Sequence, residues 1–309
     1  MIFNVLILGS GAAMPTSTRH CSGQLVSMGG KRMLIDCGEG SQDRLRKYHQ
    51  RFQSISYIFI SHLHGDHFFG LPGLLSTMHL CGRTEPVTVF APKGSKEAIE
   101  LLFKVSGTEL RYALTIEELD FEDVRVVCDD TRFVVKAFPL RHSVPTYGFI
   151  FEEKELLLNL RKDAIEKYGL TPEECVKIKH GEDLVRDDGL HVSYKELTMS
   201  RRLPRRYAYC CDTASFDELV SIVKGSDLLC LESTFDDSFE PMASEKLHCT
   251  ASQAATVAMK AGVQRLMLTH FSARFKEIDC LMEEARAVFP DTFPATDGEV
   301  YEIPYRYEK

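Results

Sequence analysis

The sequence predicts a mixed α/β fold in which functional side chains follow the carboxyl ends of strands. Apolar runs of strand length alternate with segments of helical character, and the tight turn Gly29-Gly30 joins two runs into a hairpin. Ionisable residues stand directly after several apolar runs, which is where open α/β layers place their sites. The 309 residues, 44% of them apolar, suffice for a full core.

The expected elements follow in mixed order along the chain. "NVLILGSG" is typical of a first strand, and "GQLVSMGGKRMLIDCGEG" is typical of the hairpin. Further strands are expected in "ISYIFIS", "VTVFAP", "VRVV", "RFVVKAFPLRHS", "RRYAYCCDT", "SDLLCLESTF" and "VQRLMLTHFSAR". Helices are expected in "SQDRLRKYHQRF", "LPGLLSTMHLCG", "TASQAATVAMKAG" and "EIDCLMEEARAVF", and from about Ser95 to Val105.

Residues 152–206 interrupt this pattern with charged, weakly periodic sequence. We therefore expect an inserted arm within a single domain that spans residues 1–309. Near the end of the arm, five basic residues stand against the single acidic Glu196. These basic residues are Lys195, Arg201, Arg202, Arg205 and Arg206. Two interpretations of this basic run stay open: a solvated charged face, and a contact with nucleic acid.

The overall composition narrows the class of protein. The formal net charge is -8, so any affinity for nucleic acid has to come from a local basic surface. The ten cysteines are scattered without a CxxC pair, which indicates a reducing, cytoplasmic setting. The apolar start lacks a basic region before it and is short for a signal peptide, and no membrane span is expected.

A glycine-rich stretch after the first strand, "LGSGAAMP", invites a dinucleotide-binding interpretation. Met14 occupies the position of the third glycine, Pro15 follows at once, and a hairpin comes next in place of a crossover helix. We therefore interpret this stretch as a tight turn that needs backbone freedom.

The stretch "HLHGDH" carries the strongest chemical signal. His62 and His64 lie at i, i+2 after an apolar strand, and Gly65 frees the turn that places Asp66 and His67. Imidazoles and a carboxylate without a thiolate suit Zn²⁺, with Mn²⁺ as a second option. The other histidines away from strand ends are interpreted as ordinary surface or core residues, namely His20, His49, His79, His180 and His191.

This cluster cannot close two metal sites alone, so further ligands are expected at other strand ends. His142, Asp212 and His270 each follow an apolar run and supply the missing imidazoles and a bridging carboxylate. We assign one ion to His62, His64 and His142, and the other to Asp66, His67 and His270, with Asp212 between them. Two ions about 3.5 to 4 Å apart can provide hydroxide near neutral pH and bind a phosphodiester oxygen.

Several motifs together resemble a known family. "HLHGDH" matches the HxHxDH motif of the metallo-β-lactamase superfamily. More narrowly, "SHLHGDHFFGLPGLL" with "LIDCGEG", "LESTF", "LHCTASQAA" and "LTHFSARF" resembles tRNase Z of the short form, over residues 1 to about 301. The resemblance implies a four-layered αββα sandwich, two Zn²⁺ per chain, a homodimer, and an arm that binds precursor tRNA. The arm sequence "GLTPEECVKIKHGEDL" and the loop "PTSTRH" depart from the family pattern.

The resemblance also implies individual roles in 3′-trailer removal, with a 3′-hydroxyl left on the tRNA and a 5′-phosphate on the trailer. His248 is similar to the family's proposed general acid, and Glu232 to the carboxylate that orients it. Asp66 could act as a ligand and also as the base toward water, two roles that the sequence does not separate. Arg274 is placed at the scissile phosphate, and Lys177 and Lys179 could bind tRNA phosphates. The alternative is a hydrolase of small phosphodiesters, lactones or thioesters on the same metal scaffold, and the basic arm favours tRNA. A third alternative, an RNA-binding protein without catalysis, is disfavoured because all seven ligand positions hold competent residues.

Overall fold

The computed structural model describes residues 2–155 and 157–308, which form two compact units. The first unit comprises Met1–Glu152 and Arg206–Ile303, and the second comprises Glu153–Arg205 and Pro304–Lys309. The C-terminal segment therefore joins the insertion, a pairing that the sequence pattern did not suggest.

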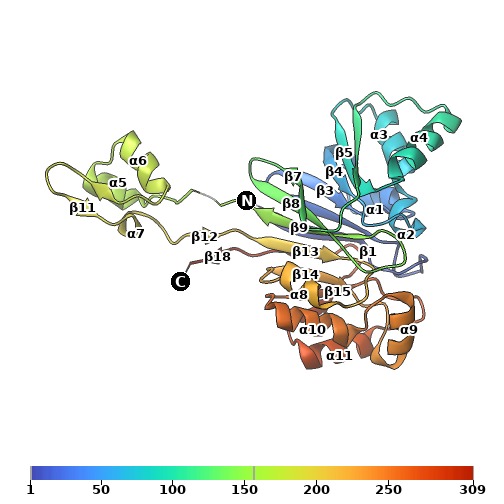
Figure 1. Ribbon diagram of the computed structural model, residues 1–309. Helices are drawn as coiled ribbons and strands as arrows, with labels where there is room; N and C mark the ends of the chain where they lie inside the picture. Colours follow the sequence, from blue (N-terminus) through green and yellow to red (C-terminus); the bar gives the residue numbers. More distant parts are fainter. Residues whose placement is uncertain (1, 156, 309) are drawn as a thin grey trace. The chain divides into compact units, whose positions relative to one another are not determined.

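Two seven-stranded sheets form the centre of the first unit (Figure 1). The first sheet has the order β17-β1-β2-β3-β4-β5-β6, and the second has the order β16-β15-β14-β13-β9-β8-β7. The strands of the first sheet are β1 (Phe3–Gly9), β2 (Gly23–Met28), β3 (Lys31–Ile35), β4 (Ile55–Phe59), β5 (Val87–Pro92), β6 (Leu114–Leu119) and β17 (Val300–Glu302). Those of the second are β7 (Arg125–Asp129), β8 (Phe133–Pro139), β9 (Tyr147–Glu153), β13 (Arg206–Cys210), β14 (Leu228–Glu232), β15 (Leu266–Thr269) and β16 (Thr292–Pro294).

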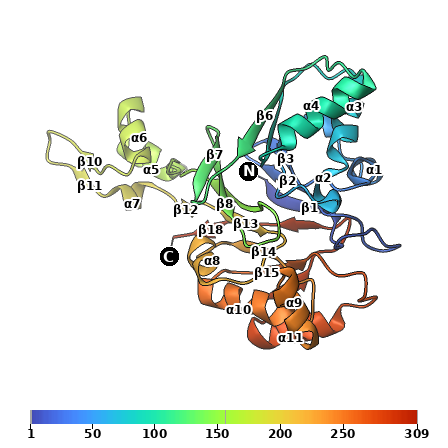
Figure 2. The same ribbon diagram turned by 45° about the vertical axis from the view of Figure 1, so that its right-hand side comes forward.

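Helices cover the outer face of each sheet, so the first unit is a four-layered αββα sandwich (Figures 1 and 2). On the side of the first sheet lie α1 (Ser41–Lys47), α2 (Gly65–Phe68), α3 (Leu71–Leu80) and α4 (Ser95–Ser106). On the side of the second sheet lie α8 (Asp217–Ile222), α9 (Glu240–Lys246), α10 (Ala251–Ala261) and α11 (Asp279–Val288). Short 3₁₀ turns occur at Phe52–Ser54 and Asp237–Phe239. The expected fold class is confirmed.

The alternation of side chains in β1 shows why the layers form. Val5 and Ile7 belong to the core between the two sheets, whereas Leu6 and Leu8 belong to the core beneath α1, α3 and α4. Successive residues of a strand point to opposite faces, so an uninterrupted apolar run fits a strand buried on both sides. The antiparallel hairpin of β1 and β2 also excludes the crossover helix of a dinucleotide site.

The strand ends bring distant residues to one edge of the sandwich. In the second sheet β13, β14 and β15 run parallel, so their carboxyl ends meet at the same edge. Asp212 follows β13, Glu232 ends β14, and His270 follows β15. In the first sheet β3 and β4 are also parallel, and they end just before Asp36 and His62 respectively. The elements expected from the sequence are confirmed. The elements of the first unit that were not recognised there are the strands β6, β9, β16 and β17 and the helices α2, α8 and α9.

The second unit contains more regular structure than its sequence indicates. Its elements are α5 (Lys162–Tyr168), α6 (Pro172–Lys179), α7 (Tyr194–Leu197), the hairpin of β10 (Leu184–Val185) with β11 (His191–Val192), and the pair of β12 (Arg202–Leu203) with β18 (Arg306–Tyr307). A small core of its own includes Ile178, Leu184 and Leu197. Thr171 and Glu174 form a capping box that starts α6.

The basic run at the end of the insertion is not a uniformly solvated face. Arg205 is buried and its Nη2 lies 2.6 Å from Oε1 of Glu153, and its guanidinium lies 4.0 Å from the ring centre of Tyr305. Arg206 donates hydrogen bonds to the carbonyl oxygens of Ile222 and Lys224. These two arginines therefore have structural partners that the local sequence could not reveal.

Two further observations concern the described part of the chain as a whole. All ten cysteines are free, as their scattered positions predicted. Among the described residues, none of the helices combines the length and the apolar character that crossing a membrane requires.

Candidate metal centre and active site

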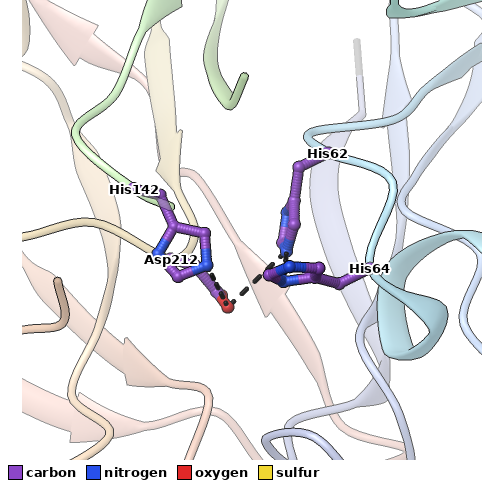
Figure 3. Close-up of side chains that lie close together, drawn as sticks. All are labelled: His62, His64, His142 and Asp212. Carbon is purple, nitrogen blue, oxygen red and sulfur yellow. Dashed lines mark hydrogen bonds and ion pairs between the residues drawn. The ribbon is translucent and has the colours of Figure 1, made fainter. Parts of the chain in front are cut away.

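Three imidazoles surround one oxygen of Asp212. The Nε2 atoms of His62 and His142 lie 3.7 and 3.8 Å from Oδ2 of Asp212. Nδ1 of His64 lies 3.1 Å from Nε2 of His62, and Figure 3 shows His142 and Asp212 approaching these two histidines from other segments. Their ligand-type atoms all lie within 4.8 Å of one another.

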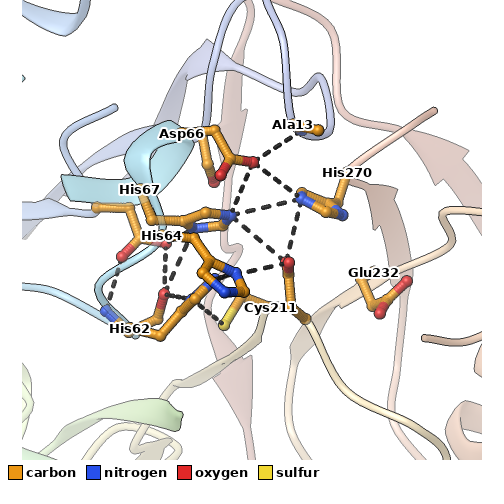
Figure 4. Close-up of polar contacts among 12 residues, drawn as sticks. Ala13, His62, His64, Asp66, His67, Cys211, Glu232 and His270 are labelled. Atoms are coloured by element: carbon orange, nitrogen blue, oxygen red, sulfur yellow. Dashed lines mark hydrogen bonds and ion pairs between the residues drawn. The ribbon is translucent and has the colours of Figure 1, made fainter. Parts of the chain in front are cut away.

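A second group surrounds the other oxygen of Asp212. Nε2 of His67 and Nε2 of His270 lie 3.4 and 3.1 Å from Oδ1 of Asp212. Oδ2 of Asp66 completes the group at 3.4 Å from His67 and 3.5 Å from His270, as Figure 4 shows. Because the two oxygens of Asp212 face different groups, this one carboxylate lies between two clusters of ligand-type atoms. The structure thus brings together the seven residues proposed from the sequence, in the same grouping.

The donor set fits divalent metal ions. Nε2 of His142 and Oδ1 of Asp212 are buried and make no hydrogen bond, although other ligand-type atoms lie near both. A buried polar atom without a hydrogen bond is costly. Zn²⁺ ligands about 2.0–2.1 Å from the ion in a tetrahedron lie about 3.3 Å from one another. The distances given above, 3.1 to 3.8 Å, are close to this value, so these residues fit such ions.

Neighbouring groups fix the orientation of the imidazoles. Nδ1 of His67 lies 2.7 Å from Oδ2 of Asp36, which also accepts a hydrogen bond from Ser61 Oγ at 2.9 Å. Nδ1 of His142 lies 3.3 Å from the carbonyl oxygen of Leu247. For both histidines an acceptor holds the proton on Nδ1 and leaves the lone pair of Nε2 facing Asp212.

Four residues around the site have a left-handed backbone that is unusual outside glycine. They are Ala13, Asp36, Leu247 and His270, with φ of 61°, 53°, 58° and 60°. Such a conformation costs on the order of 1 kcal/mol and persists where surrounding contacts require it. At Ala13 it directs the backbone N–H to Oδ2 of Asp66, at 2.8 Å (Figure 4).

His248 and Glu232 form a close pair beside the two groups. Nδ1 of His248 lies 2.6 Å from Oε1 of Glu232, which is completely buried. Burial disfavours the charged form of His248, but the adjacent carboxylate outweighs this effect and raises the pKa of His248 to about 9. His248 can therefore carry a proton at neutral pH.

A cleft of about 460 Å³ opens over these residues. His248, Asp66 and Arg274 line it, together with Lys246. The guanidinium of Arg274 lies 4.5 Å from the ring centre of Phe239 and is thereby held beside the cleft. The predicted arm residues Lys177 and Lys179 belong to α6 in the second unit.

Several residues of the site were not identified from the sequence, among them Asp36, Thr234 and Lys246. Asp36 in "LIDCGEG" follows a strand, a signal of the same kind that identified Asp212. Thr234, whose Oγ1 lies 2.9 Å from Nδ1 of His270, and Lys246 lack such a signal because they follow no apolar run directly.

The sandwich fold and its His/Asp cluster define a metal-binding hydrolase of the metallo-β-lactamase superfamily. A family model described as anti-Pycsar protein Apyc1 matches residues 3–208, and one described as β-lactamase superfamily domain matches residues 171–271.

A ribonuclease Z of Bacteroides fragilis is 41% identical over 296 residues, which cover 96% of this chain and 97% of the relative. A ribonuclease Z of Geobacillus kaustophilus is 38% identical, with 97% and 99% covered. The chain belongs to the ribonuclease Z family.

Solved structures agree with this assignment. Human tRNase Z, short form, is similar with a TM-score of 0.70 and 31% identity, over 97% of this chain and 99% of the human chain. YhfI from Bacillus subtilis, a metallo-β-lactamase fold protein, has a TM-score of 0.69 at 18% identity, over 98% and 100% of the two chains. The second comparison bears on the fold alone.

Proposed function

We propose that this chain is a zinc-dependent endoribonuclease that removes the 3′ trailer from precursor tRNA in the cytoplasm. The observation that carries the proposal is the position of Asp212 between two groups of ligand-type atoms, with the Glu232–His248 pair beside them. Membership in the ribonuclease Z family supports the substrate class. The family resemblance also leads us to propose a homodimer.

Each group would hold one divalent ion. His62, His64 and His142 would bind the first ion, Asp66, His67 and His270 the second, and Asp212 both. When bound, the ions supply positive charge to the phosphodiester and lower the pKa of a water molecule.

The protein's own groups manage the protons of the reaction. Asp66 accepts the proton that the attacking water loses, while the hydrogen bond from the Ala13 N–H holds its carboxylate in place. As water attacks phosphorus, the bond to the 3′-oxygen of the tRNA breaks, and His248 donates the proton that this oxygen needs. The tRNA then ends in a 3′-hydroxyl and the trailer begins with a 5′-phosphate.

Cationic side chains would orient the substrate. Arg274 presents a planar fork of donors that suits a phosphate beside the cleft. Lys177 and Lys179 are exposed on α6 and would contact tRNA phosphates away from the reacting group.

The test uses a tRNA transcript with a 3′ extension and the zinc-loaded protein. We expect cleavage near the discriminator nucleotide, and complete loss of cleavage in Asp66→Ala. An intact transcript together with hydrolysis of a small chromogenic phosphodiester would replace this proposal with a small-molecule phosphodiesterase.

A further inference from the structure

A buried hydrogen bond connects the two sheets beneath the candidate metal centre. The hydroxyl of Tyr209, on β13 of the second sheet, donates to Oδ2 of Asp36 at 2.7 Å. Asp36 directly follows β3 of the first sheet. Both side chains are shielded from solvent, with 1% of Tyr209 and none of Asp36 exposed. A hydrogen bond to a carboxylate in such surroundings is strong and directional.

The proposed metal ligands come from both sheets, so their spacing depends on how the sheets are held together. His62, His64, Asp66 and His67 follow strand β4 of the first sheet, and His142, Asp212 and His270 follow strands of the second. Apolar packing alone resists sliding less sharply than a directional bond, and ligand positions must be accurate to about 0.5 Å.

The Tyr209 bond closes a ring of contacts that includes a ligand from each sheet. Tyr209 contacts Asp36, and Oδ2 of Asp36 lies 2.7 Å from Nδ1 of His67. Nε2 of His67 lies 3.4 Å from Oδ1 of Asp212, and Asp212 follows the strand that carries Tyr209. A displacement of β13 would therefore move Asp212 and, through Tyr209 and Asp36, also disturb His67.

We infer that Tyr209 is a positioning residue that sets the spacing between the ligands of the first sheet and those of the second. The inference rests on the proposed metal centre. The hydroxyl of Tyr209 contacts Asp36, which is not a proposed ligand, so Tyr209 acts through Asp36. Ser22, whose Oγ lies 3.2 Å from the Tyr209 hydroxyl, adds a second contact on the side of the first sheet.

The chain offers a matched control two residues away on the same face of β13. Tyr207 is also completely buried, and its hydroxyl donates to Oε1 of Gln24 in β2. Nε2 of Gln24 lies 3.3 Å from Sγ of Cys230, so this bridge also connects the two sheets. It does not lead to a proposed ligand. Tyr207→Phe therefore removes a comparable hydroxyl without disturbing Asp36.

The experiment measures zinc affinity of the full chain by competition with a chromophoric chelator. We expect Tyr209→Phe to weaken zinc binding about tenfold, which is the lower end of the effect of removing an outer partner of a ligand. Tyr207→Phe should change the zinc affinity by no more than roughly twofold. The absorption spectrum of the Co²⁺-loaded protein should change in Tyr209→Phe only. Thermal unfolding of the metal-free variants reports any general loss of stability.

A double-mutant cycle tests the route through Asp36. In an Asp36→Asn background, Tyr209→Phe should have little further effect on zinc affinity. Unchanged zinc affinity in Tyr209→Phe, or an equal loss in both phenylalanine variants, would overturn the inference. If Tyr209→Phe does not fold, 3-fluorotyrosine can replace Tyr209, because the fluorine alters the hydroxyl as a hydrogen-bond donor. We expect this replacement to shift the zinc affinity at position 209 but not at position 207. Failure of the unaltered chain to bind zinc would instead refute the proposed metal centre.

Discussion

Nδ1 of His248 lies 2.6 Å from Oε1 of Glu232, and both carboxylate oxygens of Glu232 accept hydrogen bonds from neighbouring residues. Its Oε1 accepts a hydrogen bond from the Thr213 N–H at 3.0 Å, and its Oε2 accepts one from Thr234 Oγ1 at 2.7 Å. Glu232 therefore cannot turn away from His248. The same Thr234 hydroxyl lies 2.9 Å from Nδ1 of His270, so the proposed acid and a proposed ligand share one hydrogen-bond network.

The pH dependence of cleavage should follow from this pair. Because Glu232 outweighs the effect of burial and raises the pKa of His248 to about 9, His248 stays protonated at neutral pH and loses its proton as the pH rises through about 9. Glu232→Gln removes the negative charge, so the alkaline limb of the kcat profile should move down by about 1–2 pH units. Glu240→Gln, at an exposed position, should leave the alkaline limb of the kcat profile at its original pH. An unmoved limb in Glu232→Gln would argue against His248 as the acid.

Asp212→Asn should reduce the metal content of the protein. An amide offers one neutral oxygen in place of two charged ones, and Asp212 faces both proposed ion positions. We expect elemental analysis to find fewer than two ions per chain and kcat to fall by more than the roughly 10–100-fold typical of losing an outer partner of a ligand. The exposed Asp217 provides the control, and equal metal content in Asp212→Asn and Asp217→Asn would contradict the bridging role.

Charge reversal on α6 should affect tRNA but not a small substrate. Lys177→Glu with Lys179→Glu removes two exposed cations, and each lost phosphate contact lowers the slope of log affinity against log salt by about 1. KM for precursor tRNA should therefore rise about tenfold or more, with hydrolysis of a chromogenic diester unchanged. The exposed Lys96 and Lys104 of α4 provide a double control. If both double variants raise KM equally, α6 has no special role in binding.

The buried pair of Glu153 and Arg205 should contribute to the stability of the second unit. Removing one partner leaves a buried charge uncompensated, so Glu153→Gln should lower the free energy of unfolding by about 3 kcal/mol. Asp163→Asn, in the exposed pair with Arg161, should cause no measurable change. Urea unfolding followed by circular dichroism measures the free energy of unfolding of both variants. If Glu153→Gln unfolds with the same free energy as the unaltered chain, water takes the place of the ion pair.

Much of the site could be predicted because its residues carry local signals. His62, His64, Asp66 and His67 crowd into six residues after an apolar strand, and Asp212 and His270 also stand at the ends of apolar runs. Arg205 shows the opposite case. Its neighbours in sequence suggested a basic surface, whereas its partner Glu153 lies 52 positions away. No local pattern encodes that contact.

The sequence by itself determined most of the longer strands and helices of the first unit and the chemical types of the proposed ligands, because hydrophobic periodicity and side-chain chemistry are local properties. Only the tertiary structure decided which oxygen of Asp212 faces which histidines. It also decided that Tyr209 reaches Asp36, and that the second unit forms a core of its own. These are distances between segments far apart in the chain, and the packing of the two sheets and the separate core of the second unit set them.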